Sequence, residues 1–170
     1  MTLIKQIKIK SIPLHKVLLG LTLLYFLVFG VFMAYTAGQP DQSAHQYYSQ
    51  KFSETWGIPE EDISSGHRFF TGRPYLYYWI NGAIAKIYRG IFPNNPPIRV
   101  VMLWRVISAV ISTFTVYYCY RTASKVAENP YAGLLAAFFL SNTLMFVFIS
   151  GGNSYDNLMN LAAMAALSYS

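Results

Sequence analysis

A carboxylate and an imidazole lie four residues apart just after the first apolar stretch of the chain, at Asp41 and His45. If a helix begins at Asp41, the two side chains share one helical face. A carboxylate near the low-dielectric boundary of a membrane binds its proton more tightly than one in water. Asp41 is therefore a candidate general base, able to take a proton from the hydroxyl group of an acceptor.

Two other interpretations of this pair stay open. Asp41 follows Pro40 and can serve as the N-cap of a helix, which leaves His45 as a surface residue. Alternatively, both side chains ligate a metal ion, because carboxylate and imidazole groups are common metal ligands. The further ligands would then come from Glu60, Glu61, Asp62 or His67. Two ligand types at one spacing are too few to define a site, so we predict no metal and no cofactor.

Arg105 lies about five residues inside an apolar segment, and an ionisable group at that depth is a functional candidate. If Arg105 faces other helices, its guanidinium group can hold a phosphate through paired hydrogen bonds. If it faces lipid, its long stem reaches the membrane surface. Arg73, Lys86 and Arg89 can extend a basic ring around a lipid phosphate, or each can anchor to headgroups.

Asp156 is a second candidate acid, in the sequence Gly-Gly-Asn-Ser-Tyr-Asp-Asn at 151–157. The two glycines can end one helix, and Asn153 or Ser154 can cap the next one. The same pattern is typical of a plain interhelical turn. We expect Asp156 to have a functional role only if it emerges on the same side of a membrane as Asp41.

The composition is that of an integral membrane protein. Hydrophobic residues make up 54% of the 170 residues and charged residues only 12%, whereas soluble domains carry about 25% charge. The net charge of +6 does not indicate a nucleic-acid partner, because the basic residues are scattered at the ends of apolar segments. Cys119 is the single cysteine, so no disulfide framework is available.

Four apolar segments predict membrane spans, at residues 17–35, 100–120, 131–150 and 158–170, with the last cut short where the chain ends. Four lysines and no acid precede the first span, which places the N-terminus in the cytoplasm by the positive-inside rule. We read this span as an uncleaved anchor rather than a signal peptide, since Met33–Ala37 supplies a poor cleavage site. The predicted location is the cell membrane.

Residues 37–99 then form an external loop. Within it, the apolar residues of 74–92 recur at helical spacing while Asn81, Lys86 and Arg89 interrupt the other faces, which is typical of an amphipathic helix lying in the interface. Its aromatic residues are interpreted as an interfacial belt: Tyr75, Tyr77, Tyr78 and Trp79. If this helix crossed the membrane, Arg121 and Lys125 would face outward, against the positive-inside rule. The predicted fold is thus an all-α, polytopic membrane helical bundle with Asp41 and Asp156 on one face.

Several of these residues, taken in order, resemble the motifs of one family. They are Pro40-Asp41-Gln42 with His45, then Arg73-Pro74-Tyr75-Leu76-Tyr77-Tyr78, then Arg105 early in a span, and Asn153 with Asp156 and Leu158 before another span. This order is similar to the GT-C superfamily of membrane glycosyltransferases, and in particular to the bacterial relatives of dolichyl-phosphate-mannose protein mannosyltransferases.

The resemblance implies transfer of a sugar from a polyprenyl-phosphate donor to an acceptor on the external face, with inversion at the anomeric carbon. It implies Asp41 as the catalytic base, and we expect His45, Arg73, Arg105 and Asp156 to bind substrate. Membrane lipids are expected partners. Gln42 departs from the pattern, since many members carry a second acid there. The chain also ends partway into its fourth span, so it looks like the N-terminal part of such an enzyme.

Other classes of function fit the same sequence. A noncatalytic polytopic membrane subunit or a transporter fragment would also place acids in a polar cavity within the membrane. A truncated, inactive remnant is a third alternative. The chemistry of the enzyme needs only a base, cations for the departing phosphate and a membrane groove, and the chain has no Gly-rich phosphate motif.

Overall fold

The computed structural model describes residues 13–36, 42–55, 59 and 75–170. All regular secondary structure in these ranges is α-helical, as the sequence predicts. The helices are α1 Leu14–Thr36, α2 Gln42–Glu54, α3 Tyr75–Ile91, α4 Pro97–Val126, α5 Pro130–Asn142, α6 Leu144–Ser150 and α7 Asp156–Tyr169.

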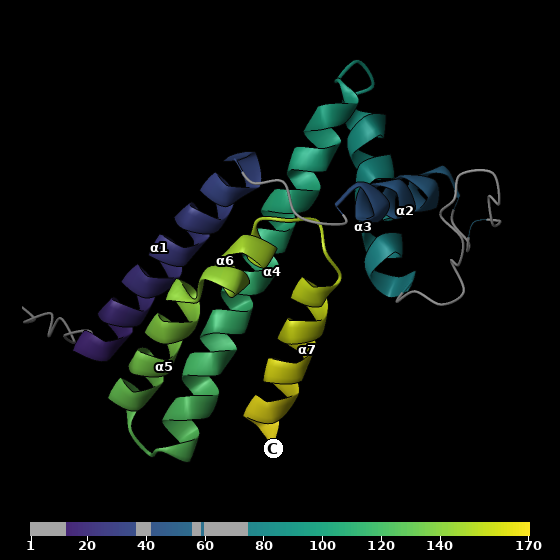
Figure 1. Cartoon of the computed structure of the whole chain (residues 1–170). Helices are drawn as coiled ribbons and strands as arrows, with labels where there is room; N and C mark the ends of the chain where they lie inside the picture. Colours follow the sequence, from purple (N-terminus) through teal and green to yellow (C-terminus); the bar gives the residue numbers. More distant parts are fainter. Residues whose placement is uncertain (1–12, 37–41, 56–58, 60–74) are drawn as a thin grey trace, which may run out of the picture.

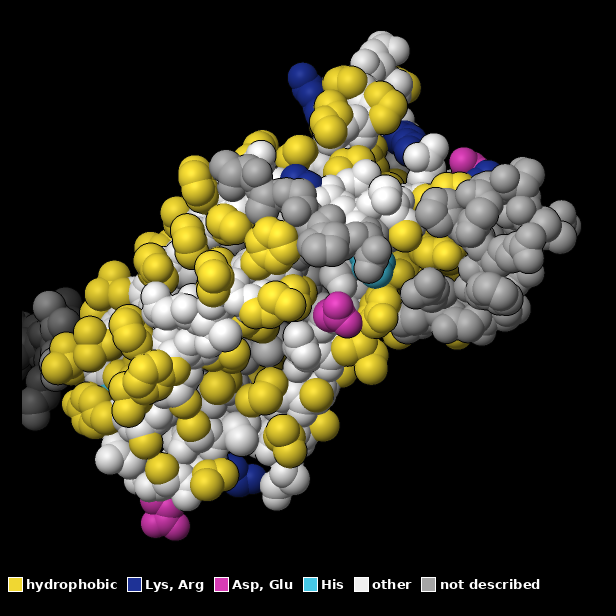
Figure 2. Space-filling model, in the orientation of Figure 1, with side chains coloured by type: hydrophobic (Ala, Val, Ile, Leu, Met, Phe, Trp, Pro, Cys, Tyr) yellow, Lys and Arg dark blue, Asp and Glu magenta, His cyan; other side chains and the backbone are white. Residues whose placement is uncertain are grey.

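Two of the described helices, α1 and α4, are long and apolar enough to cross a membrane, and α5 with α6 passes the same test as a bent pair. Hydrophobic side chains cover much of α1 and α5 in Figure 2. On α1 they include Leu21, Leu24 and Val28, each more than half exposed. Exposed apolar surface of this extent needs lipid or protein to cover it. The structure therefore indicates a membrane protein.

The stretch predicted as one span at 131–150 is divided between α5 and α6, which meet at an angle of 70°. The bend follows from the polar residues at its centre. Thr143 has an extended backbone, with its Oγ1 donating to the carbonyl of Phe139 at 2.9 Å, and Asn142 Nδ2 donates to the carbonyl of Phe138 at 2.8 Å. These side chains satisfy carbonyl groups that the interrupted helix leaves unpaired, so the break is stable in an apolar setting.

Helices α1, α4 and α5 lie side by side, with α7 along another side of α4 (Figure 1). Phe26 of α1, Val116 of α4 and Ala137 of α5 meet in one buried apolar cluster. Helix α4 runs opposite to α1, because Arg105 contacts Ala34 near the end of α1 while Val116 packs on Phe26. We call this end of the helices the Arg105 end and the opposite one the Arg121 end.

Helices α2 and α3 pack against each other beside the N-terminal half of α4 (Figure 1). Their shared core contains Tyr48, Phe52, Tyr77 and Tyr78. A Cβ atom on Gly82 would lie 2.5 Å from the carbonyl carbon of Phe52, so this contact requires glycine. Tyr77 and Tyr78 are buried against protein, so assigning them to an interfacial belt was wrong, whereas Tyr75 and Trp79 are exposed.

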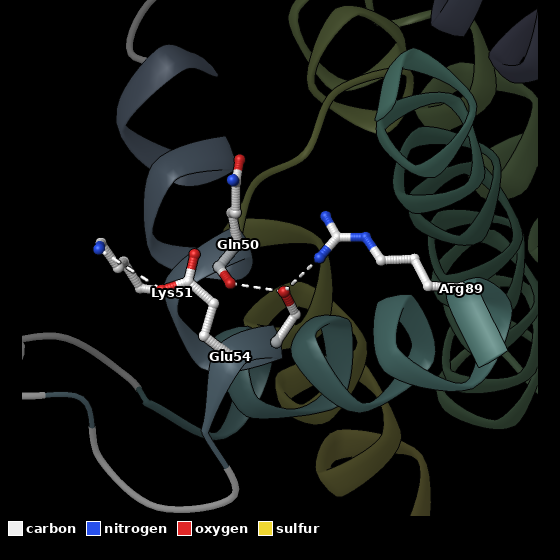
Figure 3. A network of polar contacts seen from close by, with 5 residues as sticks. Gln50, Lys51, Glu54 and Arg89 are labelled. Carbon is white, nitrogen blue, oxygen red and sulfur yellow. Dashed lines mark hydrogen bonds and ion pairs between the residues drawn. The ribbon is translucent and has the colours of Figure 1, made fainter. Parts of the chain in front are cut away.

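The far end of α2 is fixed to α3 by polar contacts (Figure 3). Arg89 Nη1 donates to Ser53 Oγ at 3.1 Å, and this hydroxyl donates in turn to the carbonyl of Gln50 at 2.6 Å. Lys51 and Glu54 form an ion pair at 3.5 Å on the same helix. Arg89 thus reaches toward α2, while Leu76, Ile87 and Ile91 of α3 stay exposed, as a helix lying on a membrane requires.

Replacing Gly133 with alanine tests the close contact of α4 and α5. The added Cβ would lie 2.5 Å from the carbonyl oxygen of Tyr120 and nearer still to the Ser124 hydroxyl, so the helices must separate. We expect the free energy of unfolding in detergent to fall by about 1–3 kcal/mol. Gly20→Ala is the matched control, since no atom lies within 4 Å of its added Cβ. Equal thermal unfolding midpoints for the two variants would contradict the packing.

Candidate functional site

Arg105 is buried and connects α4 to both α1 and α2. The side chain is 7% exposed, its Nη1 donates to the carbonyl of Ala34 at 2.5 Å, and its Nη2 donates to Gln42 Oε1. The carbonyl of Ala34 belongs to the last turn of α1, where helical partners are missing, so Arg105 supplies one. Gln42 is the first residue of α2. One guanidinium group therefore sets where α1 ends and where α2 begins.

These contacts decide between the two orientations considered for Arg105. The guanidinium group faces protein and does not extend to the membrane surface. Its two terminal nitrogens bind protein oxygens, and its Nε has no hydrogen-bond partner among the described residues. In this structure Arg105 positions two helices. Binding of a phosphate by its guanidinium group stays a prediction.

Asp41 and Arg73 lie outside the described residues, as do Glu60, Glu61, Asp62 and His67. Asp41 precedes Gln42 directly in the sequence, so the residue after the candidate base is the one that Arg105 binds. Within the described ranges, no group of three or more His, Cys, Asp or Glu residues is arranged to hold a metal ion.

His45 joins α2 to α3 and to the turn before α7. Its Nδ1 lies 2.7 Å from the Tyr78 hydroxyl, in a hydrogen bond. The imidazole ring also stacks on the Tyr78 ring, with centroids 6.0 Å apart, and meets the edge of the Tyr155 ring at 5.5 Å. His45 is half-buried, so it is neither a plain surface residue nor sealed from solvent.

Asp156 is exposed at the first position of α7. Ser154 Oγ donates to Asp156 Oδ2 at 2.9 Å and accepts from the backbone amide of Asp156 at 3.2 Å. A negative charge at this place is stabilised by the helix dipole. The preceding residue, Tyr155, is the one that contacts His45. The structure therefore brings the turn that carries Asp156 against the helix that starts after Asp41.

Gly151 sets the depth of this turn against α1. An added Cβ would lie 2.8 Å from the Cβ of Met33 and 2.9 Å from the nitrogen of Ala34, so only glycine allows the approach. Ala34 is also the residue whose carbonyl Arg105 binds. The end of α1, the start of α2 and the turn before α7 thus lie together at the Arg105 end.

Beneath this surface lies a buried polar network centred on Asn153, whose side chain is fully buried. Its Oδ1 accepts from the Tyr77 hydroxyl at 2.6 Å and from Asn81 Nδ2 at 2.9 Å, and its Nδ2 donates to Ser49 Oγ at 3.2 Å. The Tyr77 hydroxyl also lies 3.1 Å from Ser108 Oγ. Burial raises the pKa of the Tyr77 phenol, so it stays a hydrogen-bond donor at neutral pH. One amide thereby connects the turn to α2 and α3, and Tyr77 extends the connection to α4.

A second buried amide, Asn157, fixes α7 to α4. Its Oδ1 accepts from Ser112 Oγ at 2.9 Å, and its Nδ2 donates to the carbonyls of Ile149 and Gly152 at 3.1 and 3.2 Å. Sequence reasoning missed these roles, treating Asn81 as an interruption of an apolar pattern and Asn153 as a helix cap. The available signal was the presence of three asparagines within otherwise apolar or tightly turned segments.

Chemically, the Arg105 end offers a half-buried imidazole, an exposed carboxylate, the phenol of Tyr155 and the amide of Gln42 within one surface region. Such groups suit the binding of a polar, hydroxyl-bearing ligand and the transfer of a proton. The buried amides below them keep the supporting helices in place. This surface, defined by Gln42, His45, Tyr155 and Asp156, is the candidate site.

Asn153→Leu tests whether the buried network holds the site. The change leaves the Tyr77 hydroxyl, the Asn81 amide and the Ser49 hydroxyl without their shared partner, at a cost of about 1–3 kcal/mol for each group that finds none. We expect the free energy of unfolding to fall by at least about 2 kcal/mol, measured by thermal unfolding in detergent. Asn160→Leu on the exposed face of α7 is the control. The network would be ruled out as a support if both variants unfolded at the same temperature.

Comparison with known proteins returns no matching family model, no matching curated protein and no matching solved structure. The relationship to the GT-C superfamily therefore stays a prediction from the short motifs.

Proposed function

We propose that this protein is a membrane glycosyltransferase that moves a sugar from a polyprenyl-phosphate donor to an acceptor at the external face of the cell membrane. The observation that carries the proposal is the bond from Arg105 to Gln42, the residue after Asp41. It ties the start of α2 to a helix long and apolar enough to cross a membrane, beside the turn that carries Asp156. The residues of three separate motifs are thereby neighbours.

The reaction needs little from the protein beyond placement. Asp41 accepts the proton of the acceptor hydroxyl while the hydroxyl oxygen forms a bond to the anomeric carbon of the sugar. The bond from that carbon to the phosphate oxygen breaks, and its electron pair leaves with the polyprenyl phosphate. Because attack and departure occur on opposite faces, the configuration of the anomeric carbon inverts.

The other candidate residues then have distinct tasks. His45 and Asp156 contact the hydroxyl groups of the sugar or acceptor, since one is half-buried and the other exposed on the same surface region. Arg105 holds the first residue of α2, Gln42, which follows Asp41 in the sequence. Arg73 is assigned to the donor phosphate on its sequence position alone.

The charge distribution supports an external site. Of the basic residues of α1 and α4, Lys16, Arg121 and Lys125 lie at the Arg121 end, opposite the candidate site, whereas Arg99 and the buried Arg105 lie at the other end. The positive-inside rule places such an end in the cytoplasm. We therefore propose a cytoplasmic N-terminus and a candidate site on the outer side.

Asp41→Asn tests the base directly. In membrane vesicles that contain the protein, we expect the release of polyprenyl phosphate from polyprenyl-phosphate hexoses to fall at least about 100-fold, because the amide cannot accept the proton. Glu54→Gln is the matched control, an exposed acid at the last residue of α2, and should leave the rate unchanged. Retained transfer by Asp41→Asn would exclude Asp41 as the base. Sugar uptake without lipid-linked donor would favour a transporter instead.

A further inference from the structure

A groove separate from the candidate site opens where α1, α3 and the start of α4 meet. Its volume is about 470 Å³. The lining residues are Tyr35 of α1, Tyr88 of α3, and Arg99, Met102, Leu103 and Val106 of α4. None of the residues assigned to the glycosyltransferase site is among them.

The polar part of this groove is held in place by a short chain of hydrogen bonds. Asn95, in the turn between α3 and α4, donates from Nδ2 to the Tyr88 hydroxyl at 2.8 Å. Its Oδ1 accepts from Arg99 Nη1 at 2.9 Å. Asn95 is the only hydrogen-bond partner of the Arg99 side chain in the described part of the chain. The exposed guanidinium group is thus oriented while its other donors stay available to a ligand.

Arg99 lies at the depth of lipid headgroups. From Arg99 to Arg121 the helix advances about 33 Å at roughly 1.5 Å per residue, close to the ~30 Å of the hydrocarbon core. From Lys16 to Tyr35, α1 advances about 28 Å by the same measure. On α4, the polar boundaries at Arg99 and Arg121 therefore match one membrane thickness, with Arg99 at the outer one.

The apolar part of the groove continues from Arg99 toward the membrane interior. Met102, Leu103 and Val106 follow Arg99 by three, four and seven residues, so they lie on the same face of α4. A cation at headgroup depth above an apolar strip matches the shape of one lipid molecule, with a charged head and a hydrocarbon chain. No Asp or Glu residue is among the described residues that line the groove.

We propose that this groove binds an anionic phospholipid of the outer leaflet, with its phosphate on Arg99 and the upper part of one acyl chain along Met102, Leu103 and Val106. The positive charge and the absence of acids in the lining favour an anionic headgroup. Arg105, six residues deeper, binds Ala34 and Gln42 and is not among the described residues that line the groove. The proposal is independent of the glycosyltransferase activity.

Native mass spectrometry of the purified full chain in detergent, with equal amounts of phosphatidylglycerol and phosphatidylcholine, tests the proposal. We expect retained phosphatidylglycerol to exceed phosphatidylcholine about fivefold, and Arg99→Gln to remove this preference. Val106→Trp fills the apolar part and should lower the retention of both lipids. Lys125→Gln, which removes an exposed cation at the Arg121 end, is the matched control and should keep the preference.

Three results would overturn the assignment. Arg99→Gln could keep the full preference, which would exclude Arg99 as the headgroup ligand. Lys125→Gln could lose the preference equally, which would show general charge attraction without a site. Finally, polyprenyl phosphate could displace phosphatidylglycerol at equal concentration, which would assign the groove to the prenyl lipid. Inorganic phosphate alone is expected to leave the bound lipid in place, because the apolar strip contributes to its binding.

Discussion

The arrangement of this protein depends on the hydrogen bonds of one buried amide, that of Asn153. In apolar surroundings an unpaired polar group costs several kcal/mol, so the partners of Asn153 must all approach it. They come from α2 and α3, while Tyr77 connects the same amide to Ser108 of α4. Asn157 adds a second connection between α7 and α4. These hydrogen bonds thus orient α2 and α3 together with their shared core of Tyr48, Phe52, Tyr77 and Tyr78.

The need to pair buried polar groups also determines the contacts of Arg105 at the end of α1. A guanidinium group that is only 7% exposed needs oxygen partners, and it finds them in Ala34 and Gln42. The cost of burying the charge is offset by these hydrogen bonds, one of which reaches a carbonyl in the last turn of α1. The result is a defined exit from α1 and a defined start of α2. Gln42 is also the residue that directly follows Asp41, the proposed base, in the sequence.

The apolar residues of this chain are divided between surfaces that face outward and surfaces that pack against other helices. Residues such as Leu24 and Val28 of α1 and Ile87 of α3 stay exposed, while glycines at 82, 133 and 151 allow backbones to approach closely. This division is typical of membrane helices, whose contacts rely on small residues and close packing more than on apolar burial. The protein-facing sides of α2 and α3 accordingly combine aromatic residues with the polar Ser49, Ser53 and Asn81.

The sequence by itself determined the helical class, the apolar helices and the order of the candidate motifs. These features depend on local composition and periodicity. Leu21 contributes to an apolar segment and Pro97 marks the start of a helix, and neither signal depends on distant parts of the chain. Only the tertiary structure decided that Arg105 faces inward, that Tyr77 and Tyr78 are buried, and that residues 131–150 are bent at Thr143. Each of these outcomes depends on which hydrogen-bond partners a polar side chain meets across more than one helix. A partner such as Asn153, 76 residues from Tyr77, is set by packing and leaves no periodic signal in the sequence.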